Sequence, residues 1–71
     1  MSKDIVTRFG ARVKQVRTEK EITQMELCYR TGIEQKTLSA LENGRMEPCL
    51  KNIDILATGL GVTLAQLFKG L

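Results

Sequence analysis

Apolar residues recur along the chain three and four positions apart, which is the period of an α-helix. The first such stripe predicts a helix over about residues 4–20 and consists of Ile5, Phe9, Val13 and Val16. The stripe after Pro48 predicts a fourth helix and consists of Leu50, Ile53, Leu56, Ala57 and Leu60. No segment alternates apolar and polar residues with the period of two that is typical of strands. The pattern therefore predicts an all-α protein.

Two helix starts have the spacing of a capping box, in which a Thr side chain and the residue three positions later each bond the other's backbone N–H. These are Thr23 with Glu26 and Thr63 with Gln66. They predict short second and fifth helices, over about residues 24–31 and 64–69.

The middle of the chain, about residues 24–43, places two short helices on either side of a three-residue connection. The connection is Gly32, Ile33 and Glu34, and the glycine supplies the left-handed backbone that so tight a turn needs. The second of these helices is expected over residues 35–43, with Leu38 and Leu41 facing inward. We therefore expect the two helices to cross steeply, as in a helix-turn-helix.

The outward face of this second helix carries amides, a hydroxyl, a cation and a methyl group, but no carboxylate. Its members are Gln35, Lys36, Ser39, Ala40 and Asn43. Such a face suits the base edges in the major groove of duplex DNA. The alternative is an ordinary solvated helix face.

Composition and charge limit the function classes. The chain has 71 residues, which indicates a single domain over residues 1–71. Its net charge of +3 is a mild basic bias that does not by itself indicate a nucleic-acid partner. There is no His, no Gly-rich phosphate loop and no cluster of metal-ligating residues. We therefore expect no enzyme activity, no metal, no cofactor and no small-molecule ligand.

Localisation follows from what the chain lacks. No apolar run approaches the roughly 18 residues of a membrane span, and the N-terminus has no signal-peptide pattern, so we expect a cytoplasmic protein without a membrane partner. Cys28 and Cys49 are then expected to be free thiols, with a disulfide between them as the alternative.

Residues 9–68 resemble the lambda-repressor/Cro-like (XRE-type) helix-turn-helix family. The matching motifs are Thr23-Gln24, Leu27, Gly32-Ile33, the run from Thr37 to Gly44, Leu60-Gly61-Val62 and Leu67-Phe68. The resemblance implies a compact five-helix domain that binds duplex DNA sequence-specifically, usually as a homodimer on a palindromic operator. The implied protein is a small transcriptional regulator: a repressor, a restriction–modification controller or a self-repressing antitoxin. A protein–protein interaction module with the same fold, such as an antitoxin or a bridging factor, is the alternative.

Matching positions of the family also imply roles for individual residues. The implied DNA contacts are Gln24, Gln35, Lys36, Thr37, Ser39, Ala40, Asn43 and Arg45. Among them, Gln24 would contact phosphate and brace the recognition helix, and Gln35 would read adenine. Arg17 and Glu42 match a pair that forms an inward salt bridge between the first helix and the recognition helix. Glu21 stands where Gly is common, which predicts a strained left-handed residue.

A cluster of apolar residues near the C-terminus predicts a two-fold interface between two copies of the chain. So small a core has no room for every apolar side chain of the fifth helix, and Ile55 falls on the opposite side of the fourth helix from Ile53. The predicted interface consists of Ile55, Leu64, Phe68 and Leu71.

Overall fold

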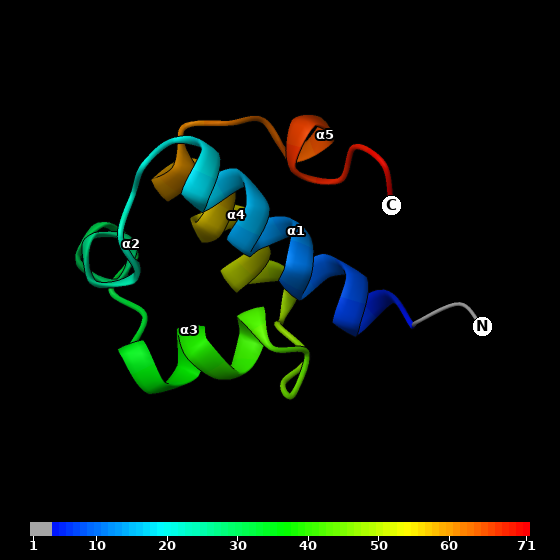
Figure 1. Cartoon of the computed structure of the whole chain (residues 1–71), viewed down its shortest axis with the longest axis horizontal. Coiled ribbons are helices and arrows are strands. Elements are labelled where there is room, and N and C mark those ends of the chain that lie inside the picture. Colours follow the sequence, from blue (N-terminus) through cyan, green and yellow to red (C-terminus); the bar gives the residue numbers. More distant parts are fainter. Residues whose placement is uncertain (1–3) are drawn as a thin grey trace.

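The computed structural model describes residues 4–71, which form five helices (Figure 1). They are α1 (Ile5–Glu19), α2 (Gln24–Thr31), α3 (Gln35–Glu42), α4 (Leu50–Leu60) and α5 (Leu64–Leu67). The described residues contain no strand, so the all-α prediction is confirmed. The fifth helix is shorter than expected, because the chain leaves the helix at Phe68 and continues as a turn.

The two predicted capping boxes differ in the structure. At α5 the box is complete, since Gln66 N donates to Thr63 Oγ1 (3.0 Å) and Thr63 N donates to Gln66 Oε1 (2.8 Å). At α2 only half of it forms: Glu26 N donates to Thr23 Oγ1 (3.0 Å). The Glu26 carboxylate instead accepts a charge-assisted bond of 2.6 Å from Arg30, one turn further along. The prediction of a full box at Thr23 is therefore wrong.

The starts of α1 and α3 are capped unequally. Asp4 caps α1 by accepting a bond of 3.0 Å from Thr7 N, and this bond holds the pKa of the Asp4 carboxyl below its ordinary value. Glu34 precedes α3 but makes no side-chain capping bond, in keeping with its weak capping tendency. At the end of α1, Glu21 adopts a left-handed φ of 57°, which confirms the strain predicted there.

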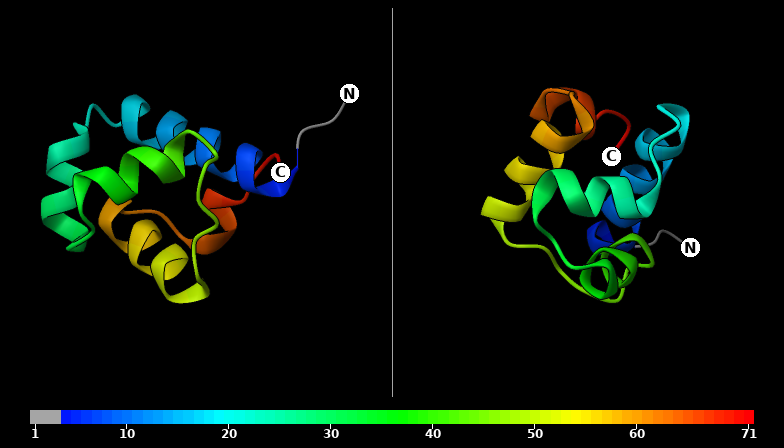
Figure 2. Two further views of the ribbon diagram at one scale, coloured as in Figure 1. Left: turned by 90° about the horizontal axis from the view of Figure 1, so that it is seen from below. Right: turned by 90° about the vertical axis from the view of Figure 1, so that its left-hand side faces the viewer.

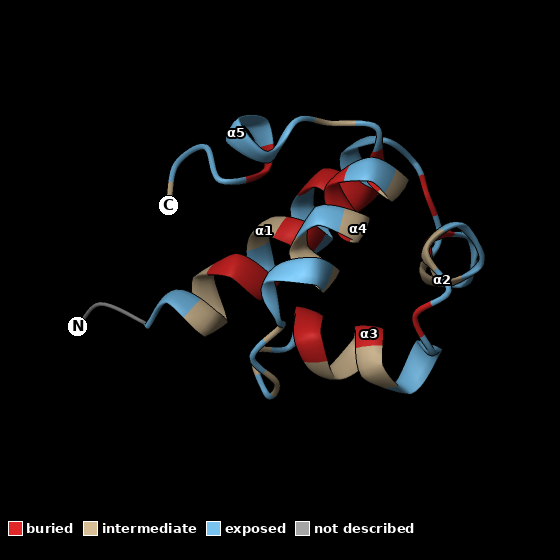
Figure 3. Ribbon diagram, turned by 180° about the vertical axis from the view of Figure 1, so that it is seen from behind, coloured by how far each residue is buried: buried red, intermediate tan, exposed pale blue. Residues whose placement is uncertain are grey.

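One aliphatic core lies between the helices, and Figure 3 shows the buried residues on the inward sides of α1, α3 and α4. Its members are Phe9, Val13, Val16, Ile22, Leu27, Ile33, Leu38, Leu41, Leu56, Ala57, Leu60 and Leu67. Two residues predicted to face inward do not belong to it: Ile5 is 49% exposed and Leu50 is 80% exposed. Each stands in the first turn of its helix, where the stripe extends past the neighbouring helices.

Close backbone contact sets the position of α3 against α1. A Cβ atom on Gly10 would collide with the carbonyl oxygen of Leu41, so only glycine lets α1 approach the end of α3 this closely. Figure 1 shows α3 along one edge of the molecule and α5 at the opposite edge, with α1 and α4 between them. Within residues 4–71, no helix is long and apolar enough to cross a membrane.

Candidate nucleic-acid interface

The turn between α2 and α3 is held by its own hydrogen bonds. Gly32 has a φ of 76° and donates to the carbonyl of Cys28 (2.8 Å), which ends α2. Thr31 Oγ1 donates to Leu27 O (2.7 Å) and accepts from Ile33 N (3.2 Å). Ile33 is buried, which directs α3 across α2. Figure 2 (left) shows α3 crossing the molecule, with α2 beside its first residues. The predicted helix-turn-helix is thus present.

The outward side of α3 is polar and free of acid. Gln35, Lys36 and Asn43 are exposed, and Thr37, Ser39 and Ala40 are half-buried. The one carboxylate of α3, Glu42, faces inward. The exposed acids that flank α3 in the sequence are Glu34, just before the helix, and Glu47, in the loop after it. The face therefore offers amide, hydroxyl and ammonium groups to a ligand, with no carboxylate to repel a polyanion.

A buried ion pair fastens α3 to α1. Arg17 Nε donates to Glu42 Oε2 (2.7 Å) and Arg17 Nη2 donates to Glu42 Oε1 (3.0 Å), a bidentate pair. The side chains are 10% and 2% exposed, and the hydrogen bond with Glu42 raises the pKa of Arg17. Arg17 Nη1 also donates to the carbonyl of Ile22 (2.9 Å), which ties the α1–α2 connection to the pair. The predicted inward salt bridge is present.

Gln24, at the start of α2, joins this pair. Its Nε2 donates to Glu42 Oε1 (3.1 Å), and the residue is half-buried. The side chain thus braces α3, as expected. The α2 N-terminus, whose first backbone N–H groups have no partner within the helix, is joined by this bond to the last residue of α3. This arrangement suits a phosphate group next to the recognition helix.

The end of α3 positions two further predicted contacts. Asn43 closes the helix, and its Nδ2 donates to Ser39 O (2.8 Å). Arg45 N donates to Ala40 O (2.9 Å), which holds the first residues of the loop against the helix end. The Arg45 side chain is exposed. The polar face therefore continues from Gln35 to Arg45, over the whole length of α3.

Comparison with known proteins shows which family has this helix-turn-helix. The family model described as "Helix-turn-helix" matches residues 13–67. The chain belongs to this helix-turn-helix family. It is a sequence-specific DNA-binding transcriptional regulator of the Cro/repressor type, and the family is one of DNA-binding regulators, not of enzymes.

Two relatives of this helix-turn-helix protein, and one structure with the same fold, are control or restriction–modification controller proteins. Control protein C.MunI of Mycoplasma sp is 34% identical over 93% of this chain and 90% of its own length. The restriction–modification controller C.AhdI from Aeromonas hydrophila superimposes with a TM-score of 0.85 at 32% identity, over 89% of this chain and 96% of that one. The controller C.Esp1396I, solved as a tetramer with its natural 35-base-pair operator, has a TM-score of 0.88 over 96% and 90% of the two chains. At 22% identity, this last likeness concerns the fold alone.

The residues predicted to join two copies divide into two groups. Leu64 and Phe68 are 42% and 38% exposed. Ile55 and Leu71 are half-buried and pack against the core of their own chain, so the expectation that Ile55 points away from the core is wrong. Ile53 and Ile55 of α4 are thus both packed against the core, although the helical period places them on opposite sides of the helix.

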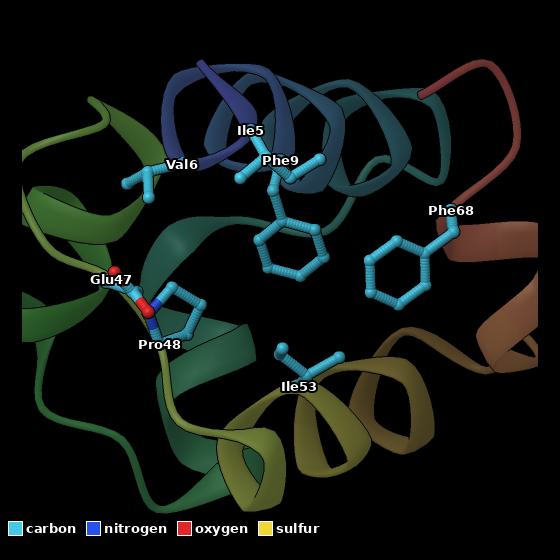
Figure 4. Close-up of a pocket in the computed structure, with 7 residues that line it drawn as sticks. All are labelled: Ile5, Val6, Phe9, Glu47, Pro48, Ile53 and Phe68. Atoms are coloured by element: carbon cyan, nitrogen blue, oxygen red, sulfur yellow. The ribbon is translucent and has the colours of Figure 1, made fainter.

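Sequence reasoning missed an apolar groove beside Phe68. Phe68 stacks on Phe9 with ring centroids 5.3 Å apart, and the groove next to them has a volume of about 180 Å³ (Figure 4). Its lining residues come from α1, the α3–α4 loop, α4 and the end of α5, and are Ile5, Val6, Phe9, Glu47, Pro48, Ile53 and Phe68. In the sequence Ile5 only continues the apolar stripe of the first helix, so the pattern assigned it to the core and gave no sign of the groove.

The remaining chemistry of the chain is sparse. Cys28 and Cys49 are free thiols, and burial raises the pKa of Cys28. Within the described residues, no three His, Cys, Asp or Glu side chains gather where they could hold a metal ion.

Proposed function

We propose that this regulator is a cytoplasmic homodimer that binds a palindromic operator, with α3 of each copy in the major groove. The acid-free outward face of α3, fastened by the buried Arg17–Glu42 pair, is the observation that carries the proposal. A rigidly held helix with amide and ammonium groups outward has the shape and the hydrogen-bonding groups that base edges require.

Each end of α3 has a separate role in this proposal. Gln35 and Lys36, in the first turn, reach base edges: the amide pairs with adenine and the ammonium with guanine or a phosphate. Thr37, Ser39 and Ala40 are the half-buried middle of the face and make shorter contacts, such as Ala40 with a thymine methyl. The flanking contacts to the sugar–phosphate backbone come from Gln24, Asn43 and Arg45, which fix the register without reading sequence.

A second copy of the chain is the proposed occupant of the apolar surface around α5. Leu64 and Phe68 are exposed there, and the groove beside Phe68 adds the exposed Ile5 to the same surface. Ile55 and Leu71, which are half-buried against the core of their own chain, belong to the proposed interface only as far as their exposed parts reach it. A two-fold dimer places two recognition helices about 34 Å apart, which corresponds to half-sites about 10 base pairs apart.

Selection of duplexes from a random library tests the DNA-binding part of the proposal. We expect a two-fold symmetric site whose half-sites are separated by about one helical turn. Binding should weaken steeply as salt concentration rises, because phosphate contacts release counterions. Recovery of no preferred duplex would contradict the proposal and favour the protein–protein interaction module instead.

Sedimentation velocity tests the dimer. Leu64→Glu places a charge on an exposed position of α5, so the chain should fold but remain monomeric. Tyr29→Glu is the matched control, because Tyr29 is an exposed apolar side chain on α2. The parent and the control should sediment as dimers at micromolar concentration. A monomeric parent, with and without DNA, would contradict the homodimer.

The resemblance to controllers favours one regulatory role over the others. C.MunI and C.AhdI match this chain over nearly their whole length, and both carry the name of a control or controller protein. We propose that this protein, too, acts as a controller whose occupancy of the operator depends on its own concentration. A reporter under the selected operator should respond steeply to the amount of protein expressed. A response that is independent of protein level would contradict this role.

A further inference from the structure

One stripe of α1 faces α3 and the loop after it. Gly10 and Arg17 contact the last turn of α3, through the close backbone approach and the buried ion pair. Thr7 packs against Gly44, where a Cβ atom would lie 3.0 Å from the Thr7 α-carbon. These contacts show which side of α1 lies along the recognition helix.

Lys14 belongs to this stripe. It follows Thr7 by seven residues and Gly10 by four, and it precedes Arg17 by three, and residues at these separations share one side of a helix. Unlike Gly10 and Arg17, Lys14 is exposed, so it lies where the stripe meets solvent beside α3. The ammonium group of Lys14 forms no hydrogen bond or ion pair with any of residues 4–71.

We propose that Lys14 binds a DNA phosphate on the flank of the recognition helix. A helix lying in the major groove has a sugar–phosphate backbone on each side, and contacts to these backbones set the orientation of the protein. Lysine provides a compact charge on a flexible stem, which suits a single phosphate. The proposal rests on the proposed placement of α3 in the groove and adds α1 to the interface.

A structural role for Lys14 makes a different prediction. The C-terminal end of α3 carries partial negative charge, and a nearby ammonium group would stabilise it. Such a role would affect the stability of the free protein, whereas a phosphate contact affects the dependence of DNA binding on salt. The two roles are therefore separated by measuring both quantities.

The experiment compares Lys14→Ala with Lys69→Ala, a charge-matched control at an exposed position that follows α5, the helix at the edge of the molecule opposite α3. Fluorescence anisotropy measures the affinity for the duplex selected with the parent between 50 and 200 mM salt. Each lost phosphate contact reduces the slope of log affinity against log salt by about 0.9. Between about 50 and 200 mM salt, the fold-loss of affinity should therefore be about 3.5 times smaller for Lys14→Ala than for the parent, counted for each bound chain. The control should match the parent, and Lys14→Arg should retain the parental slope.

Three outcomes overturn the proposal. An unchanged slope in Lys14→Ala shows that no phosphate is bound there. A lower thermal midpoint with an unchanged slope assigns Lys14 to the end of α3 instead. An equal change in Lys69→Ala shows that only net charge matters. A parent that binds no duplex would overturn the proposed function as well, whereas a parent that binds normally confines the failure to Lys14.

Discussion

Removing one member of the Arg17–Glu42 pair should strongly destabilise the protein. Arg17→Met deletes the two bonds to Glu42 and the bond to the Ile22 carbonyl. The Glu42 carboxylate, only 2% exposed, then keeps the Gln24 amide as its remaining partner. Leaving such a charge buried and unpaired costs about 3–5 kcal/mol. A domain of this length has a free energy of unfolding of about 4–11 kcal/mol, so the loss takes a large part of it.

A double-mutant cycle shows whether the pair acts as a unit. Arg17→Met, Glu42→Gln and the double variant are unfolded in urea at one fixed protein concentration, with helix content followed by circular dichroism. In the double variant no buried charge remains, so it should be more stable than the sum of the two single losses predicts, by at least about 2 kcal/mol. Additive losses within about 0.5 kcal/mol, or a loss below about 1 kcal/mol in Arg17→Met, would refute the reasoning.

Three further experiments test individual contacts of the fold. Gly10→Ala forces the backbones of α1 and α3 apart and should cost about 1–3 kcal/mol in urea unfolding; an unchanged midpoint would mean that the close approach is not required. Thr63→Ala removes the complete capping box of α5 and should cost about 0.5–2 kcal/mol in the same assay, and a cost near zero would argue against the cap. A thiol reagent at pH 8 should modify the exposed Cys49 first, because burial both shields Cys28 and raises its pKa, which lowers its thiolate fraction; mass spectrometry showing equal rates would contradict this.

Local signals in the sequence predicted most of the fold. Thr63 with Gln66 formed its capping box because both partners lie within one turn, and each side chain bonds the other's backbone N–H. Glu26 has the same spacing from Thr23, yet Arg30 competes for its carboxylate, and a charged partner forms the stronger bond. Spacing alone does not reveal this competition.

Features that depend on tertiary packing were harder to predict. Ile5 and Leu50 continue the apolar stripes of their helices but extend past the core, because a stripe does not show where the neighbouring helices end. The groove beside Phe68 combines α1, a loop, α4 and the end of α5, which lie far apart in the sequence. At the candidate site, the family resemblance predicted the Arg17–Glu42 pair. It also predicted that Gln24 supports α3, but only the structure shows that this support is a hydrogen bond to Glu42.

The proposed contact between Gln35 and a base provides the most direct test of the central claim, that α3 lies in the major groove. Duplex selection is repeated with Gln35→Ala, with Lys69→Ala as the control at the far side of the molecule. The account predicts that Gln35→Ala loses its preference at one base pair in each half-site, at a cost of about 1–3 kcal/mol on the parental duplex, while the other positions keep theirs. A Gln35→Ala protein that selects the same site as the parent, with the same affinity, would contradict the placement of α3 in the major groove.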